Sequence, residues 1–95
     1  MATKYAFTQG LREVRFHLCP QGSGSDATRT FLRRAYPTMK HHNPNTPILI
    51  REATGIEPKM WARYAGAKER QQSLAGLSDK EIEEKVTGMV KSEYS

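Results

Sequence analysis

Residues 11–18 read LREVRFHL, and the pattern within this stretch decides the fold. Apolar and polar side chains alternate along it, so that Val14, Phe16 and Leu18 lie on one side. Strict alternation predicts a strand with one buried face and one exposed face. The sequence CPQGSGS that follows, residues 19–25, predicts a loop, because a proline and two glycines interrupt regular structure.

A helix and a second strand are predicted next. Ser25 or Asp26 can cap the helix, whose apolar side chains recur at helical spacing. These side chains are Ala27, Phe31, Leu32, Ala35, Tyr36 and Met39. Pro37 removes a helix hydrogen bond, so we expect a kink or an early end near Tyr36. The continuous run ILI at residues 48–50 is typical of a central strand buried on both faces, and a strand–helix–strand unit predicts two parallel strands.

The remainder of the chain predicts two more strands and a second helix. Strands are expected at residues 60–65, which contain the only tryptophan, and at residues 70–74, with Gly66 beginning the hairpin loop between them. Ser78 and Glu81 match a capping box, which marks the start of the last helix. Its buried stripe is predicted to contain Ile82, Val86, Met89 and Val90.

The predicted order β-α-β-β-β-α indicates the α/β class. We expect a single thioredoxin-like domain over residues 11–95, with a mixed sheet of three to four strands, two main helices and no middle helix, preceded by an N-terminal arm at residues 1–10. Two helices would cover one sheet incompletely, and we expect a partner protein to complete the uncovered face.

Composition limits the function classes. The chain has 95 residues, of which 37% are hydrophobic and 26% charged, which is typical of one soluble globular domain. No run of apolar residues approaches the ~18 needed for a membrane span. The single cysteine, Cys19, excludes a disulfide-based scaffold and fits a reducing compartment.

Positive charge is concentrated in the first half of the chain. The net charge is +5, but residues 1–51 hold eight Lys and Arg against two Asp and Glu, whereas residues 52–95 hold seven against eight. Such a basic region could meet nucleic acid, acidic lipid or an acidic protein. The first helix carries Arg29, Arg33, Arg34 and Lys40, but no aromatic residues alternate with them for base stacking, so a solvated helix face is favoured.

The sequence contains no convincing catalytic or metal-binding pattern. Cys19 ends the first strand shortly before a helix, where thioredoxin-like folds place a reactive thiol, but Gly22 stands where a second cysteine would complete a Cys-x-x-Cys motif. His41 and His42 lack further ligands at metal-binding spacing. Nothing orients His17 with Ser23, Ser25 and Asp26 as a nucleophilic triad. We therefore expect no catalytic residues, no cofactor and no metal.

Four motifs resemble a known family. They are LREVRFHLC at 11–19, NP at 43–44, PILIRE at 47–52 and PKMWARYA at 58–65. Together they resemble the NADH dehydrogenase 1 alpha subcomplex subunit 2 family, small accessory subunits of mitochondrial respiratory complex I. The wider family includes mitochondrial ribosomal proteins, which leaves an RNA-binding ribosomal protein as an alternative.

The resemblance implies a non-catalytic structural or assembly subunit with a thioredoxin-like fold. It implies a position in the matrix arm, near the NADH-oxidising module on the matrix side of the inner membrane, packed on the largest iron–sulfur subunit. Neither nucleic acid nor a direct membrane span is then expected. Candidate partner-contact residues are Arg29, Arg33, Arg34, Lys40, Trp61 and Arg63.

The resemblance also concerns the thiol. The resemblance implies that animal members of the family carry a second cysteine after the segment equivalent to IRE at residues 50–52. That cysteine could pair with the equivalent of Cys19. This chain has Ala53 at that position. A redox role is therefore in doubt here. A monothiol oxidoreductase, in which Cys19 attacks a disulfide and an external thiol resolves the intermediate, is the enzymatic alternative.

Overall fold

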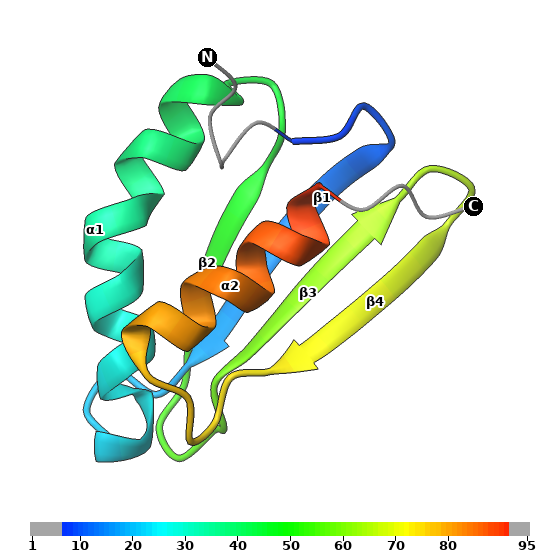
Figure 1. Ribbon diagram of the computed structural model, residues 1–95. Helices are drawn as coiled ribbons and strands as arrows, with labels where there is room; N and C mark the ends of the chain where they lie inside the picture. The colour runs from blue at the N-terminus through cyan, green and yellow to red at the C-terminus, as the bar shows by residue number, and fades with distance from the viewer. Residues whose placement is uncertain (1–6, 92–95) are drawn as a thin grey trace.

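A computed structural model describes residues 7–91 of the chain (Figure 1). Its elements follow the order β1 (Leu11–Leu18), a 3-10 turn (Ser23–Ser25), α1 (Asp26–His42), β2 (Ile48–Glu52), β3 (Lys59–Tyr64), β4 (Lys68–Ser73) and α2 (Asp79–Val90). The predicted order and the α/β class are confirmed, with the third and fourth strands each beginning one or two residues earlier than expected.

The four strands form one mixed sheet in the order β2-β1-β3-β4. β1 pairs in parallel with β2, placing Val14 opposite Ile48, and antiparallel with β3, placing Val14 opposite Ala62. β3 and β4 form an antiparallel hairpin. The prediction that the first two strands are parallel neighbours is therefore confirmed.

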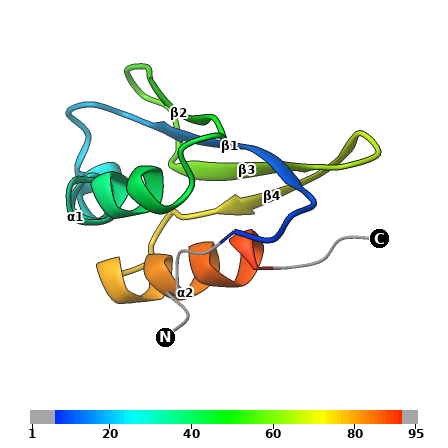
Figure 2. The same ribbon diagram turned by 90° about the horizontal axis from the view of Figure 1, so that it is seen from above.

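Both helices pack on the same face of this sheet, as Figure 2 shows from above. Alternation along β1 places Val14, Phe16 and Leu18 in the core between sheet and helices, at 0%, 0% and 2% exposure. The Phe31 ring on α1 lies 6.4 Å from the Phe16 ring. Burying each such side chain contributes about 1.5–3 kcal/mol, so β1 contributes much of the stability of the fold.

α1 corrects the expected effect of Pro37. The helix continues through this residue to His42, and Pro37 is exposed. On the exposed side of a helix, water can hydrate the carbonyl that loses its partner one turn earlier. The next turn is held by Met39, which is fully buried, and by Asn43, whose backbone N and Nδ2 both donate to the Met39 carbonyl. Packing and capping beyond the proline therefore offset its cost of about 3 kcal/mol.

β2 corrects a second expectation. The run ILI was predicted to be a central strand buried on both faces, but β2 lies at the edge of the sheet and only Ile48 is buried. Leu49 and Ile50 are 38% and 42% exposed. A run of three apolar residues cannot distinguish a central strand from an edge strand. The run shows only that the residues are apolar, and it does not show how many strands lie beside them.

α2 begins at the predicted capping box. Ser78 Oγ accepts a hydrogen bond from Glu81 N, and Glu81 Oε1 accepts one from Ser78 N. The bond from the Ser78 backbone is the main reason that the pKa of Glu81 is lowered. The predicted stripe of Ile82, Val86, Met89 and Val90 is buried. Tyr64 Oη donates to the Met89 carbonyl at 2.7 Å, which ties this helix to β3.

The first six residues of the predicted N-terminal arm lie outside the described residues. The remainder of the arm contacts the domain: Phe7 N donates to Asn43 Oδ1, and Thr8 N donates to the Val90 carbonyl. The Gly10 carbonyl accepts from Ala65 N at 2.7 Å. Residues 7–10 therefore connect the ends of both helices to the hairpin.

The hairpin between β3 and β4 contains a strained residue. Gly66 and Ala67 both have positive φ, at 81° and 62°. A left-handed backbone brings the Cβ of an alanine close to the carbonyl oxygen, at a cost of about 1–2 kcal/mol that glycine avoids.

We expect Ala67→Gly to stabilise the protein by ~0.5–1 kcal/mol, because relief of this strain exceeds the greater entropy of glycine in the unfolded chain. Urea unfolding measures the change. Gly66→Ala is the matched control and should destabilise the protein by a similar amount. A lower unfolding midpoint for Ala67→Gly would contradict the prediction.

Candidate functional site

Cys19 lies directly after β1 and is buried. Its Sγ accepts hydrogen bonds from Gly22 N at 3.2 Å and from Gly55 N at 3.3 Å. The bond from Gly55 is the largest cause of a lowered pKa for this thiol, followed by backbone bonds from Gln21 and Gly22, and the charge of Arg29 acts in the same direction. Two loops distant in sequence therefore donate to one sulfur atom, and sequence reasoning did not identify either donor.

A depression of about 410 Å³ lies beside the thiol. Its wall combines the loop after β1, the loop after β2 and the loop before α2. Gly22 stands very close to the sulfur, since a Cβ at that position would lie 3.1 Å from Sγ. This arrangement can stabilise a thiolate, but the chain has no second cysteine to resolve a mixed disulfide.

Ala53 follows the end of β2, next to the thiol loop. The parallel register ends with Leu18 opposite Glu52, and Ala53 N donates to the Leu18 carbonyl at 3.1 Å. Ala53 is exposed. The register thus continues toward Cys19 and Ala53 as neighbours, and their pairing as a disulfide site stays a prediction.

We expect the thiol of Cys19 to titrate below the pKa of an ordinary cysteine, because the N–H groups of Gly55 and Gly22 stabilise the charged sulfur. Thiolate absorbance in the ultraviolet, followed against pH, measures the midpoint, with a Cys19→Ser protein as the blank. A midpoint equal to or above that of a free cysteine would contradict this.

We expect an Ala53→Cys variant to form an intramolecular disulfide with Cys19 under mild oxidation. The bridge would close a loop of about 33 residues, and the chain-entropy relation gives ~3–4 kcal/mol of stabilisation, less any strain. Mass spectrometry of the unreduced protein and thermal unfolding with and without reductant measure both effects. Failure to oxidise would contradict the prediction, because a disulfide needs Cα atoms ~4.4–6.8 Å apart and Cβ atoms directed toward each other.

The basic residues of α1 make contacts within the protein. The Arg29 guanidinium binds Asp26 and the Cys19 carbonyl, and Lys40 Nζ donates to the carbonyls of Pro44 and Thr46. Arg33 is exposed. The high density of positive charge along α1 is therefore partly used to secure its flanking loops.

Arg34 joins the two helices. Its guanidinium pairs with Asp79 at 2.6 Å and with Glu83 at 2.8 Å, and lies 5.6 Å from the Phe31 ring centre. The two carboxylates raise the pKa of Arg34, and the hydrogen bond that its guanidinium donates to Asp79 is the largest cause. An arginine predicted as a partner contact is thus placed at the α1–α2 interface.

Trp61 and Arg63 lie on β3, on the face of the sheet opposite the helices, because they alternate with the buried Met60, Ala62 and Tyr64. The Trp61 ring is half-buried and lies 6.2 Å from the ring of His17 on β1. The candidate partner-contact residues are therefore divided between two sides of the molecule.

The residues considered for a triad make unrelated contacts. Ser25 Oγ accepts from Cys19 N, and Asp26 pairs with Arg29, whereas His17 packs against Trp61. The rings of His41 and His42 meet edge to face at 5.2 Å at the end of α1. Within residues 7–91, no group of three or more His, Cys, Asp or Glu is arranged to hold a metal ion.

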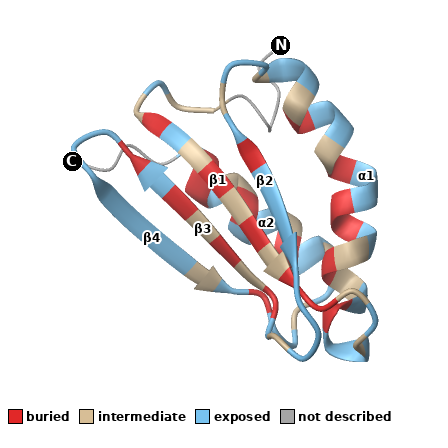
Figure 3. Cartoon of the chain, turned by 180° about the vertical axis from the view of Figure 1, so that it is seen from behind, coloured by how far each residue is buried: buried red, intermediate tan, exposed pale blue. Residues whose placement is uncertain are grey.

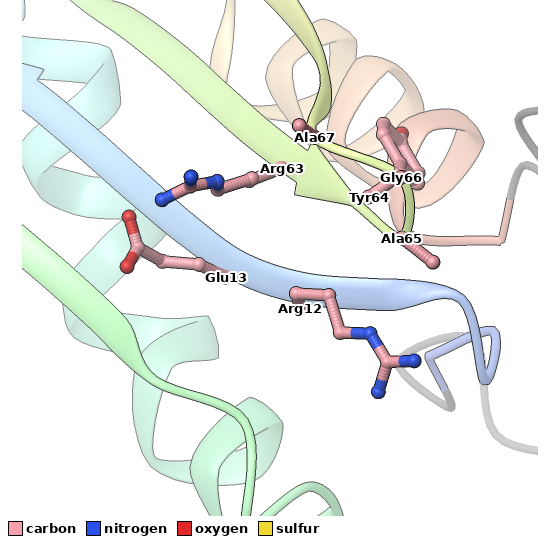
Figure 4. Close-up of a pocket in the computed structure, with 7 residues that line it drawn as sticks. All are labelled: Arg12, Glu13, Arg63, Tyr64, Ala65, Gly66 and Ala67. Atoms are coloured by element: carbon pink, nitrogen blue, oxygen red, sulfur yellow. The ribbon is translucent and has the colours of Figure 1, made fainter.

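A second depression, also of about 410 Å³, lies at the end of β3 (Figure 4). The side chains of Glu13 and Arg63 extend toward each other over the sheet, while Arg12 points away from both. Its two arginines thus do not converge on one point, so the depression has no centre suited to an anion. Neither helix in the described part of the chain has the length and apolar character needed to cross a membrane.

Comparison with known proteins identifies the family. The model described as mitochondrial ribosomal protein L51 / S25 / CI-B8 domain matches residues 28–79. The chain belongs to this L51/S25/CI-B8 family. The motifs at 43–44, 47–52 and 58–65 lie within the matched region, which runs from the first turn of α1 to the start of α2, and the motif at 11–19 precedes it.

Members of the L51/S25/CI-B8 family that resemble the chain over most of its length are named as complex I subunits. The chain is 55% identical to the NADH-ubiquinone oxidoreductase 10.5 kDa subunit of Neurospora crassa, over 97% of this chain and 98% of that protein. It is 48% identical to mouse NADH dehydrogenase [ubiquinone] 1 alpha subcomplex subunit 2, over 77% of this chain and 74% of that protein. The Arabidopsis thaliana protein of the same name is 40% identical over 97% and 95%. The resemblance found from the sequence motifs is confirmed.

Proposed function

We propose that this protein is a non-catalytic accessory subunit of mitochondrial NADH:ubiquinone oxidoreductase, respiratory complex I. The observation that carries the proposal is the 55% identity with the Neurospora crassa 10.5 kDa subunit of that enzyme, which extends over 97% of this chain. Identity over whole lengths implies a shared surface as well as a shared core, because few surface residues are needed to maintain a fold.

A structural or assembly role follows from the chemistry at Cys19. The thiol is buried, its sulfur accepts two backbone hydrogen bonds, and Ala53 supplies no resolving sulfur. A single thiol of this kind completes no catalytic cycle without an external thiol able to reach it. In our proposal the protein stabilises neighbouring subunits through its surface and transfers neither electrons nor protons itself.

The finer placement is also part of the proposal. The subunit belongs to the matrix arm near the NADH-oxidising module, on the matrix side of the inner membrane, and contacts the largest iron–sulfur subunit. The net charge of +5 supports docking on an acidic protein surface, because opposite charges accelerate and orient association.

A ribosomal role is the second candidate, since the family description includes mitochondrial ribosomal proteins. RNA binding would require free cations that can follow a phosphate backbone. On α1, Arg34 is paired with two carboxylates and Arg29 with one, so only part of the positive charge there is available. This pairing favours the respiratory complex.

We expect the full chain, tagged and expressed in mitochondria that lack it, to co-migrate with complex I in native separations. Deleting it should reduce the amount of assembled complex, whereas NADH oxidation per assembled complex should stay unchanged if the role is structural. Mass spectrometry of each separated particle measures co-migration and the amount of assembled complex, and an NADH-oxidation assay of the isolated complex measures its activity. Co-migration with ribosomal subunits, sensitive to ribonuclease, would overturn the proposal.

A further inference from the structure

The face of the sheet opposite the helices is uncovered by any described element. Figure 3 shows this face toward the viewer, with α2 behind the strands and α1 beside β2. The strand registers place its side chains in three rows across the sheet. The rows are Leu49, Arg15, Trp61 and Gln71; then Arg51, His17, Lys59 and Ser73; then Glu13, Arg63 and Glu69. We call this surface the open face.

The open face is positively charged. It carries Arg15, Arg51, Lys59 and Arg63 against Glu13 and Glu69. Arg15 is paired with Glu13, which leaves most of the excess charge in the row around His17. Burial lowers the pKa of His17, and the positive charges of Arg51, Arg15 and Lys59 lower it further.

Two aromatic side chains, Trp61 and His17, lie among the basic residues of the open face. Trp61 and His17 are half-buried and lie 6.2 Å apart, and neither Trp61 Nε1 nor His17 Nε2 has a hydrogen-bond partner within the described part of the chain. An indole N–H is a donor only, and leaving it unpaired is costly. Tryptophan surrounded by arginine is also the composition typical of the centre of a protein interface.

The pattern favours a protein over RNA as the partner. Trp61 is the one large aromatic ring among the residues that form the three rows, whereas binding of single-stranded RNA relies on several successive stacking rings. Glu13 and Glu69 would repel phosphates at one end of the face. An acidic protein surface can place its carboxylates against Arg51 and Lys59 and avoid that end.

The open face is smaller than one side of a standard protein interface, so the contact must extend onto the surface beside it. Four strands of five to eight residues, about 4.8 Å apart and rising about 3.3 Å per residue, cover on the order of 400 Å². A standard interface uses about 800 Å² of each partner. The contact can continue around the β2 edge, from Leu49 in the first row of the open face to Ile50 on the other side of the strand, opposite Phe16. These two apolar side chains are 38% and 42% exposed.

We propose that the open face, continued over the β2 edge, is the surface by which this subunit docks on an acidic surface of a neighbouring protein subunit. Trp61 is the central anchor, Arg51 and Lys59 pair with the partner's carboxylates, and Leu49 and Ile50 bury against its apolar side chains. This inference rests on the proposed function, since it describes how the accessory subunit is held in complex I.

Matched charge reversals test the proposal. Arg51→Glu on the open face and Arg33→Glu on the exposed side of α1 remove the same side chain from two sides of the molecule. In mitochondria lacking the native protein, each tagged full-length variant is expressed and its recovery with affinity-purified complex I is measured. We expect Arg51→Glu and Trp61→Ala to lower recovery by about tenfold or more. Arg33 is a candidate contact from the sequence that docking through the open face does not use, so Arg33→Glu should leave recovery unchanged.

The outcomes separate the two proposals. If the wild-type chain is not recovered with complex I, the proposed function fails. If Arg51→Glu and Trp61→Ala are recovered with complex I as well as the wild type is, the docking inference fails and the proposed function stands. Release of the wild-type chain by ribonuclease would identify RNA as the partner and overturn the docking inference.

A second experiment, maleimide labelling of an introduced cysteine, tests the same surface without relying on variants that could be unstable. Gln71→Cys adds a thiol to the row of Trp61, and Arg33→Cys adds one to α1, both at exposed positions, while Cys19 is buried in each protein. We expect maleimide to label both free proteins, and assembly into complex I to protect Gln71→Cys only. A Gln71→Cys thiol that remains reactive in the assembled complex would overturn the proposal.

Discussion

The two-residue period of β1 is the constraint on which the rest of the structure depends. Burying Val14, Phe16 and Leu18 under the helices requires Glu13, Arg15 and His17 to project from the opposite face. β1 pairs with strands on both sides and lies at the centre of the core. Because both helices are already committed to one face, no described element remains to cover the other. The surface that we assign to a partner is therefore a direct consequence of how the core is built.

Charge in this protein has two separate roles. Along α1, the guanidinium groups of Arg29 and Arg34 bind carboxylates of the same chain, and Arg34 thereby connects the helices that cover the sheet. On the open face, Arg51, Lys59 and Arg63 outnumber the nearby carboxylates. The arginines of α1 support the fold, and the basic residues of the open face supply a positive electrostatic potential at the surface. Net charge per segment cannot separate these roles, because it ignores pairing between distant residues.

Sequence reasoning predicted those features that depend on local pattern. Alternation identified β1, helical spacing identified the buried stripe of α2, and the Ser78–Glu81 capping box marked where that helix begins. It failed where the outcome depends on neighbours distant in sequence. Pro37 stays helical because Met39 packs into the core two residues later, and residues 48–50 form an edge strand because no described strand lies beyond them.

The site was predictable to a similar extent. Cys19 was found because it follows a strand and precedes a helix, which are local facts. The hydrogen bond to its sulfur from Gly55, thirty-six residues away, depends on the parallel pairing of β1 and β2 and has no local pattern. Likewise, the family motif drew attention to Trp61 and Arg63, but the strand register was needed to show that His17, Arg51 and Lys59 share their face.

The hydrogen bonds of Cys19 give its thiol a structural role that requires no redox chemistry. Its Sγ accepts from Gly22 N and Gly55 N, so it connects the loop after β1 to the loop after β2, and the same bonds that lower its pKa hold these loops together. The Cys19 backbone adds two further bonds, to Ser25 Oγ and from Arg29. Arg29 and Ser25 lie at the beginning of α1, so the sulfur, the helix start and the end of β2 form one structural unit. A buried thiol used in this way helps to hold β1 and β2 together, and these two strands form part of the open face.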